Sequence, residues 1–173
     1  MTRFDEVKAR FWDEGSCGSV SPVTEEAIKE AEHRLGVRLP ASLLELLRIR
    51  DGGLVAEAWD AFPTDVPTSW SADHVPFGEL LGIGRYDRRS SLLDSPYRIA
   101  EWGLPTPLVL LSGDGHTWIA LDYRSCGERG EPSVTWFDEE YGTGLPLAAD
   151  FRTFVERLAP ASSFDHDDAA RHG

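Results

Sequence analysis

Cysteine is scarce in this sequence, because Cys17 and Cys126 are the only two among 173 residues. They form no CxxC pair and have no spacing typical of metal ligands, so we expect reduced thiols, no metal site and no disulfide. A chain of this length buries roughly 70% of its unfolded surface and does not need disulfides for stability. The composition therefore predicts a cytoplasmic protein, and no motif calls for a cofactor.

Long apolar runs and an export signal are also missing. The longest apolar candidate is the short run 108–111, whereas a membrane helix needs roughly 18 apolar residues. Residues 1–15 mix charges of both signs with apolar side chains, unlike the basic and then apolar layout of a signal peptide. These absences predict a soluble protein with no membrane partner.

Basic residues are few, since 17 Lys and Arg stand against 30 Asp and Glu and give a formal net charge of −13. The isoelectric point is near 4.7. A nucleic-acid ligand needs a basic surface that neutralises its phosphates, so this composition argues against direct binding of DNA or RNA. Basic partners remain possible.

The negative charge is concentrated in residues 51–80, which contain six acidic side chains and no Lys or Arg. This segment is either an acidic docking surface or a solvated loop that keeps an acidic protein in solution, and the sequence leaves both interpretations open. A second acidic edge follows the last predicted strand. The candidate acidic residues are Asp51, Glu57, Asp60, Asp65, Asp73 and Glu79, with Glu139 and Glu140 at the second edge.

Three tryptophans are candidates for partner binding. Trp59 and Trp70 flank the acidic stretch 60–65, and Trp118 lies on the same face of a predicted strand as His116 and Asp122. An indole beside carboxylates suits a binding hot spot, because the ring supplies apolar area while the acids attract a basic partner. Packing in the core is the competing interpretation, since tryptophans in a small domain are mostly buried.

No residue pattern predicts catalysis. His116 and Asp122 share a strand face, but at about 3.3 Å per residue they are roughly 20 Å apart, too far to bind one metal ion. The sequence has no GxSxG motif and no pair of histidines at zinc-helix spacing. We therefore predict that the protein is not an enzyme. An enzyme that uses His116 with a nearby acid is the weaker alternative.

Apolar spacing predicts helices near both ends of the chain and a meander of strands between them. The expected helices cover residues 4–15, 24–36, 40–52 and 151–158, and the expected strands cover 108–112, 116–123 and 133–137. Thr24 suits a helix N-cap and Gly36 a helix end. We predict one α+β domain over residues 1–160, with an antiparallel sheet packed by helices on one face. Residues 161–173 are expected to form a flexible tail.

Three sequence blocks resemble the SUKH superfamily, in the branch of the fungal cell-wall-assembly regulator and its bacterial toxin-immunity relatives. The first block, IKEAEHRLGVRLPASLLELLRIRDGG, joins two helices through a Gly and a Pro. The second, EWGLPTPLVLLSGDGHTWIALDYR, contains a glycine-rich hairpin, and the third, PSVTWFDEEYGTGLPLAADFRTFVERL, ends in a Phe-bearing helix. Their common order makes the resemblance more specific than any block alone.

The resemblance implies an α+β domain that works by binding a protein and has no catalytic residues. Many relatives are immunity proteins that neutralise toxins, often nucleases or deaminases. An acidic protein can occupy the basic groove with which such a toxin grips phosphates. The leading hypothesis is a non-catalytic immunity protein that binds a basic toxin through its acidic surface. The alternative is an intracellular regulatory scaffold of the cell-wall-regulator type.

Overall fold

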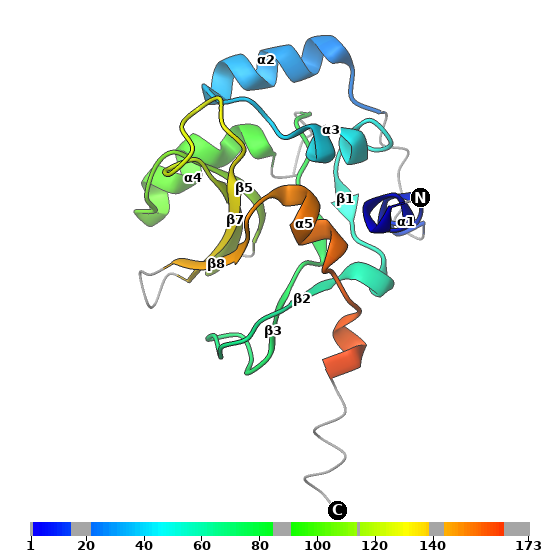
Figure 1. Cartoon of the computed structure of the whole chain (residues 1–173). Coiled ribbons are helices and arrows are strands. Elements are labelled where there is room, and N and C mark those ends of the chain that lie inside the picture. The colour runs from blue at the N-terminus through cyan, green and yellow to red at the C-terminus, as the bar shows by residue number, and fades with distance from the viewer. Residues whose placement is uncertain (1, 15–21, 85–90, 114, 139–143, 165–173) are drawn as a thin grey trace, which may run out of the picture.

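The computed structural model describes residues 2–14, 22–84, 91–113, 115–138 and 144–164. A four-stranded antiparallel sheet forms their centre, in the order β5-β6-β7-β8, with helices packed around it (Figure 1). Consecutive strands are neighbours, so the predicted meander is confirmed and extends by one strand, β8. The strands are β5 (Leu108–Gly113), β6 (Thr117–Asp122), β7 (Ser133–Asp138) and β8 (Gly144–Ala148).

The helix predicted from residue 24 shows how local chemistry sets its ends. The Thr24 hydroxyl accepts a hydrogen bond from the Ala27 N–H at 3.2 Å, which satisfies a free donor of the first turn. Gly36 ends the helix with a φ of +71°, a conformation that glycine adopts at little cost. The helices among the described residues are α1 (Arg3–Ala9), α2 (Glu25–Leu35), α3 (Ala41–Leu47), α4 (Ser95–Trp102) and α5 (Phe151–Glu156).

Two helices are shorter than predicted. Helix α1 ends at Ala9 rather than near position 15, because the following residues pair with an extended segment and the Asp13 N–H donates to the Leu54 carbonyl at 3.0 Å. Helix α3 ends at Leu47 rather than at position 52. After Leu47 the chain tightens, since the Ile49 N–H donates to the Leu46 carbonyl at 3.1 Å, and Gly52, with a φ of +84°, cannot continue a helix.

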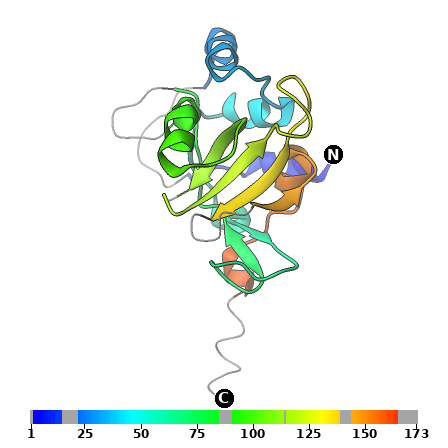
Figure 2. The same ribbon diagram turned by 90° about the vertical axis from the view of Figure 1, so that its left-hand side faces the viewer.

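Both faces of the sheet are buried, and helices lie on opposite sides of it (Figures 1 and 2). One face packs with α1, α2, α3 and α5 into the main core. The other face packs Trp118, Ala120 and Phe137 against Ile99 of α4. The α+β class is confirmed, but the prediction that helices cover one face is incomplete, because α4 was not predicted. Helix α4 is only eight residues long, has Pro96 near its start and buries Ile99 as its one large side chain, so it carries few local signals.

Two pairs of short strands extend from the main core. β1 (Gly53–Leu54) pairs with β4 (Glu79–Leu80), and β2 (Ala61–Pro63) pairs with β3 (His74–Pro76). Aromatic packing on α5 anchors this second pair, because Phe62 stacks on Phe154 at 4.8 Å and Phe77 meets the same ring edge-on at 4.9 Å. We call residues 61–76 the hairpin; it projects beyond the sheet in Figure 2.

The start of the predicted tail packs on the hairpin. Residues Ala161–Phe164 form a 3-10 turn, η3. The Phe164 ring stacks on His74 with centroids 4.4 Å apart, and the Ala161 N–H donates to a carboxylate oxygen of Asp60 at 2.8 Å. Residues 165–173 lie outside the described part of the chain, so the domain boundary near residue 160 stays a prediction.

Candidate partner-binding groove

One row of residues across the four strands forms the floor of a groove. Ser112 of β5 pairs with Ile119 of β6, Ile119 with Trp136 of β7, and Trp136 with Leu145 of β8. Thr117 and Asp138 form the next pair on the same face, two positions along the strands. Because paired residues of a sheet point to the same side, the row offers one continuous surface toward the hairpin.

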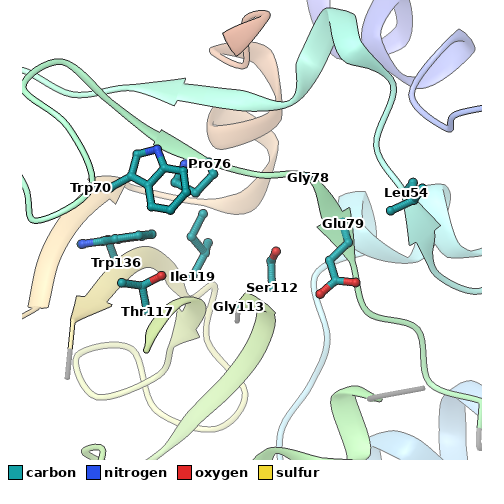
Figure 3. Close-up of a pocket in the computed structure, with 10 residues that line it drawn as sticks. All are labelled: Leu54, Trp70, Pro76, Gly78, Glu79, Ser112, Gly113, Thr117, Ile119 and Trp136. Atoms are coloured by element: carbon teal, nitrogen blue, oxygen red, sulfur yellow. The ribbon is translucent and has the colours of Figure 1, made fainter. Parts of the chain in front are cut away.

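The hairpin and the β1–β4 pair form the opposite wall, and the groove has two chambers. The first chamber has a volume of about 340 Å³, and Figure 3 shows Trp70 facing Trp136 and Ile119 there, with Glu79 beside Ser112. The second chamber, of about 470 Å³, lies beyond Trp136. Trp136 lines both, so the two chambers meet at this residue. The other lining residues are Leu54, Pro76, Gly78, Gly113 and Thr117 in the first chamber and Val66, Pro67, Thr68, Ser69, Asp138, Gly144 and Leu145 in the second.

Hydrogen bonds hold the tip of the hairpin in one conformation. The Thr68 hydroxyl accepts from the N–H groups of Trp70 at 3.1 Å and Ser71 at 3.4 Å. The Ser71 hydroxyl accepts from the His74 N–H at 3.0 Å. The Ser69 hydroxyl donates to the Asp138 carboxylate and ties the tip to β7. Trp70 is therefore presented by an ordered loop, which lowers the entropy lost when a partner binds.

Asp73 is part of the same tip. Its carboxylate lies 2.8 Å from Nδ1 of His74, and this hydrogen bond holds the pKa of Asp73 below its ordinary value of 3.8, with a smaller contribution from the Ser71 hydroxyl. The carboxylate is therefore ionised at neutral pH and adds negative charge to the hairpin.

The groove combines exposed apolar side chains with negative charge. Leu54, Val66 and Trp70 are 48%, 45% and 50% exposed, and they are three of the five large exposed apolar side chains among the described residues. Glu79 and Asp138 are the charged residues that line it, and within the described residues no Lys or Arg does so. An apolar patch with an acidic rim is complementary to a surface of apolar and basic side chains.

The structure brings four of the candidate residues to this end of the molecule. Trp70 and Glu79 line the groove. Asp65 is exposed in the hairpin loop, and Asp73 lies in the tip with its side chain 45% exposed. Glu139 and Glu140 lie outside the described residues. For these six residues the role in partner binding stays a prediction.

Four other candidates lie away from the groove. Glu57 is exposed at the start of the 3-10 turn η1 (Glu57–Trp59), and Asp60, which follows it, accepts the Ala161 hydrogen bond. Trp59 is half-buried, with the Arg3 guanidinium 4.9 Å from its ring centroid. Trp118 is only 3% exposed because α4 covers it. We leave these side chains out of the proposed surface.

Asp51 is buried and serves the fold. It is 7% exposed, and its carboxylate accepts a hydrogen bond from the Ile83 N–H at 2.7 Å. This contact joins the end of the α3 segment to the residues after β4. The backbones approach so closely that a Cβ on Gly82 would lie 2.2 Å from the Asp51 carboxylate oxygen.

Replacing Asp51 with alanine is expected to lower the free energy of unfolding by about 1–3 kcal/mol, because a buried N–H loses its acceptor. Urea denaturation measures the change. Glu57→Ala is the matched control, since Glu57 is an exposed acid of the same segment, and it should change stability by at most about 0.5 kcal/mol. Equal effects of the two substitutions would contradict a structural role for Asp51.

Several groove residues were not predicted from the sequence. Trp136 and Ile119 have the pattern of core strand residues, and both are almost fully buried. Leu54 and Val66 are single apolar residues in irregular segments, and no local signal distinguishes an exposed one from a buried one. The hairpin on one side and the sheet on the other create the groove, and they are distant in sequence.

Two features are absent from the described residues: a cluster of metal-binding side chains and a membrane-spanning helix. In the part of the chain that the structure describes, no three His, Cys, Asp or Glu residues are grouped so that they could hold a metal ion. None of the described helices has the length and apolar character needed to cross a bilayer.

The fold and the groove define an α+β domain with helices on both faces of a four-stranded meander. A model of the SMI1 / KNR4 family (SUKH-1) matches residues 22–157. The chain belongs to this family, and the resemblance to the SUKH superfamily is confirmed. Membership supports an immunity-like or regulator-like role, in a family of generally non-catalytic domains linked to toxin immunity. A comparison with curated proteins found no match.

Proposed function

We propose that this protein is a non-catalytic immunity protein that binds and neutralises a basic toxin domain, of the kind that acts on nucleic acid. The observation that carries the proposal is the gathering of exposed apolar side chains, Leu54, Val66 and Trp70, at a groove lined by acidic but not basic residues. Trp70 is the anchor, and the carboxylates at the rim attract the partner.

The position of His116, the one residue considered as a catalytic base, agrees with a non-catalytic role. His116 is exposed and lies beside Trp102, with ring centroids 6.4 Å apart. A catalytic histidine is commonly oriented by a carboxylate that accepts from its second ring nitrogen, and the Asp122 carboxylate, at the other end of β6, pairs with Arg124 at 2.8 Å instead.

The proposal is tested with purified toxin domains. Basic nuclease and deaminase toxin domains are immobilised beside acidic domains of similar size, and binding of this protein is measured together with inhibition of nucleic-acid cleavage or deamination. We expect one or more basic domains to bind and lose activity. If every toxin domain stays unbound and active while a regulator of the cell's own machinery is bound, the regulatory alternative replaces the proposal.

Charge removal at the groove is expected to slow association. In Asp65→Asn/Glu79→Gln the association rate constant at low salt should fall about tenfold, and its dependence on salt should flatten, because the acids steer a basic partner. The control, Glu101→Gln/Glu128→Gln, removes the same charge from exposed positions on α4 and on the loop at the opposite end of the sheet. Stopped-flow measurements compare the pairs, and equal rates in both would refute steering by the groove.

A further inference from the structure

The spacing of the two chambers limits what can fill both of them. The sheet residues of the first chamber lie on β5 and β6, and those of the second lie on β7 and β8, with Trp136 between them. Neighbouring strands are about 4.8 Å apart, so the chamber centres are separated by about two strand spacings, or roughly 10 Å. An occupant of both needs two side chains at that distance on one side of its backbone.

Three regular backbones can be compared with this distance. In a β-strand, side chains on one face are about 6.6 Å apart at positions i and i+2 and about 13 Å apart at i and i+4, so neither spacing fits. In an α-helix, side chains at positions i and i+7 lie on one face about 10.5 Å apart, so the spacing alone also fits a helix. A polyproline II segment has three residues per turn and rises about 3.1 Å per residue, so positions i and i+3 face the same way at about 9 Å. The chemistry of the lining has to decide between the helix and the polyproline II segment.

The chemistry of the lining agrees with the polyproline II backbone. The walls present the indoles of Trp70 and Trp136 and the rings of Pro67 and Pro76. Polyproline II segments bind in grooves lined by aromatic side chains, because their backbone is already extended and loses little entropy. Glu79 lines one chamber, and the other is lined by Asp138, which is 7% exposed and accepts from the Ser69 hydroxyl. Because no described Lys or Arg lines either chamber, the groove as a whole favours positive charge.

We infer that the groove binds a polyproline II segment of its protein partner, with apolar side chains at positions i and i+3 and Lys or Arg beside them. This inference rests on the proposed function in that it takes the partner to be a basic protein. One apolar side chain enters the chamber at Leu54 and Trp70, and the other enters the chamber at Val66 and Leu145.

Three synthetic peptides test the inference with the full chain. The first is Lys-Leu-Pro-Pro-Leu-Lys, which has leucines at i and i+3. The second, Lys-Leu-Pro-Leu-Pro-Lys, has the same composition with leucines at i and i+2, and the third, Glu-Leu-Pro-Pro-Leu-Glu, reverses the flanking charge. Titrations followed by NMR shifts of the backbone and indole N–H groups measure the Kd of each. We expect the first to bind at least about tenfold more tightly than the others, with shifts at Trp70, Thr117 and Leu145.

Single substitutions test separately how much each chamber contributes to binding of the first peptide. Leu54→Ser and Val66→Ser each change one exposed side chain, in the first and the second chamber. Each should weaken binding of the first peptide by about fivefold or more, whereas Tyr97→Ser, at a side chain 70% exposed on α4, should not change it. Equal binding of the first two peptides, shifts confined to α4, or no shift at millimolar peptide would overturn the inference.

The peptide titrations and the binding experiment with toxin domains can succeed or fail independently of each other. If a basic toxin domain binds and the peptides do not, the inference fails and the proposed function stands. If the first peptide binds as expected and no toxin domain does, the inference about the groove stands and the proposed function fails.

Discussion

Replacing Phe154 with alanine is expected to lower the free energy of unfolding by about 3–5 kcal/mol, the largest stability effect that we predict. Phe154 is fully buried in α5 and contacts Phe62, Phe77 and Phe151 through its ring. The substitution removes buried apolar area and leaves a cavity beneath the hairpin. Thermal and urea unfolding, followed by circular dichroism, measure the loss.

The milder change Phe154→Leu separates stability from the anchoring of the hairpin. It keeps most of the buried volume but removes the ring that stacks on Phe62, so it should cost less free energy while still loosening the wall of the groove. Hydrogen exchange at the Thr64 N–H, which donates to the Asp73 carbonyl at 2.8 Å, should become faster than in the native chain. Tyr97→Ala is the exposed control. Unfolding free energies within about 1 kcal/mol of each other for Phe154→Ala and the control would show that α5 does not anchor the hairpin.

Replacing Trp70 with alanine is expected to weaken binding of the basic partner by at least about 2 kcal/mol, or roughly 30-fold in Kd. The indole is half-exposed, lies in a preorganised loop and lines the first chamber. Its loss removes apolar contact area that the partner buries, so the dissociation rate should rise while the association rate changes little. Surface plasmon resonance measures both rates.

The matched control for Trp70 is a tryptophan outside the groove. Trp59→Phe changes a half-buried indole that lies under the Arg3 guanidinium, and it should leave the Kd within about twofold of the native value. Since Trp70 lies at the surface, Trp70→Ala should keep the native unfolding midpoint. An unchanged dissociation rate in a folded Trp70→Ala protein would remove this residue from the interface.

Several elements could be predicted because their signals are local. Helix α2 has its hydroxyl cap at Thr24 and its left-handed glycine at Gly36, and the strands around the turn at Gly113 have strong β-sheet propensity. Helix α4 was not predicted, because its burial depends on a sheet face formed by residues later in the chain. Strand β8 has the alternation GLPLA with a proline inside it, a weak strand pattern that pairing with β7 overrides.

The candidate site also has features that the sequence predicts and features that depend on packing. Negative charge and tryptophan content are properties of composition, and by themselves they favour a basic protein partner. Which tryptophan is accessible depends on what packs over it, and Trp118 is covered by α4 whereas Trp70 is held out by a hairpin tip. Asp51 belongs to the acidic segment by sequence, yet its carboxylate accepts a hydrogen bond from the backbone N–H of Ile83, which is distant in the chain.

The sequence by itself determined the α+β class, the family, the caps of α2 and the excess of negative charge, because each depends on residue types and short spacings. Only the tertiary structure decided where the groove lies. Its floor is one residue from each of four strands, and its other wall comes from the hairpin and the β1–β4 pair. Burial and accessibility are properties of contacts between segments far apart in the chain, and no local pattern contains them.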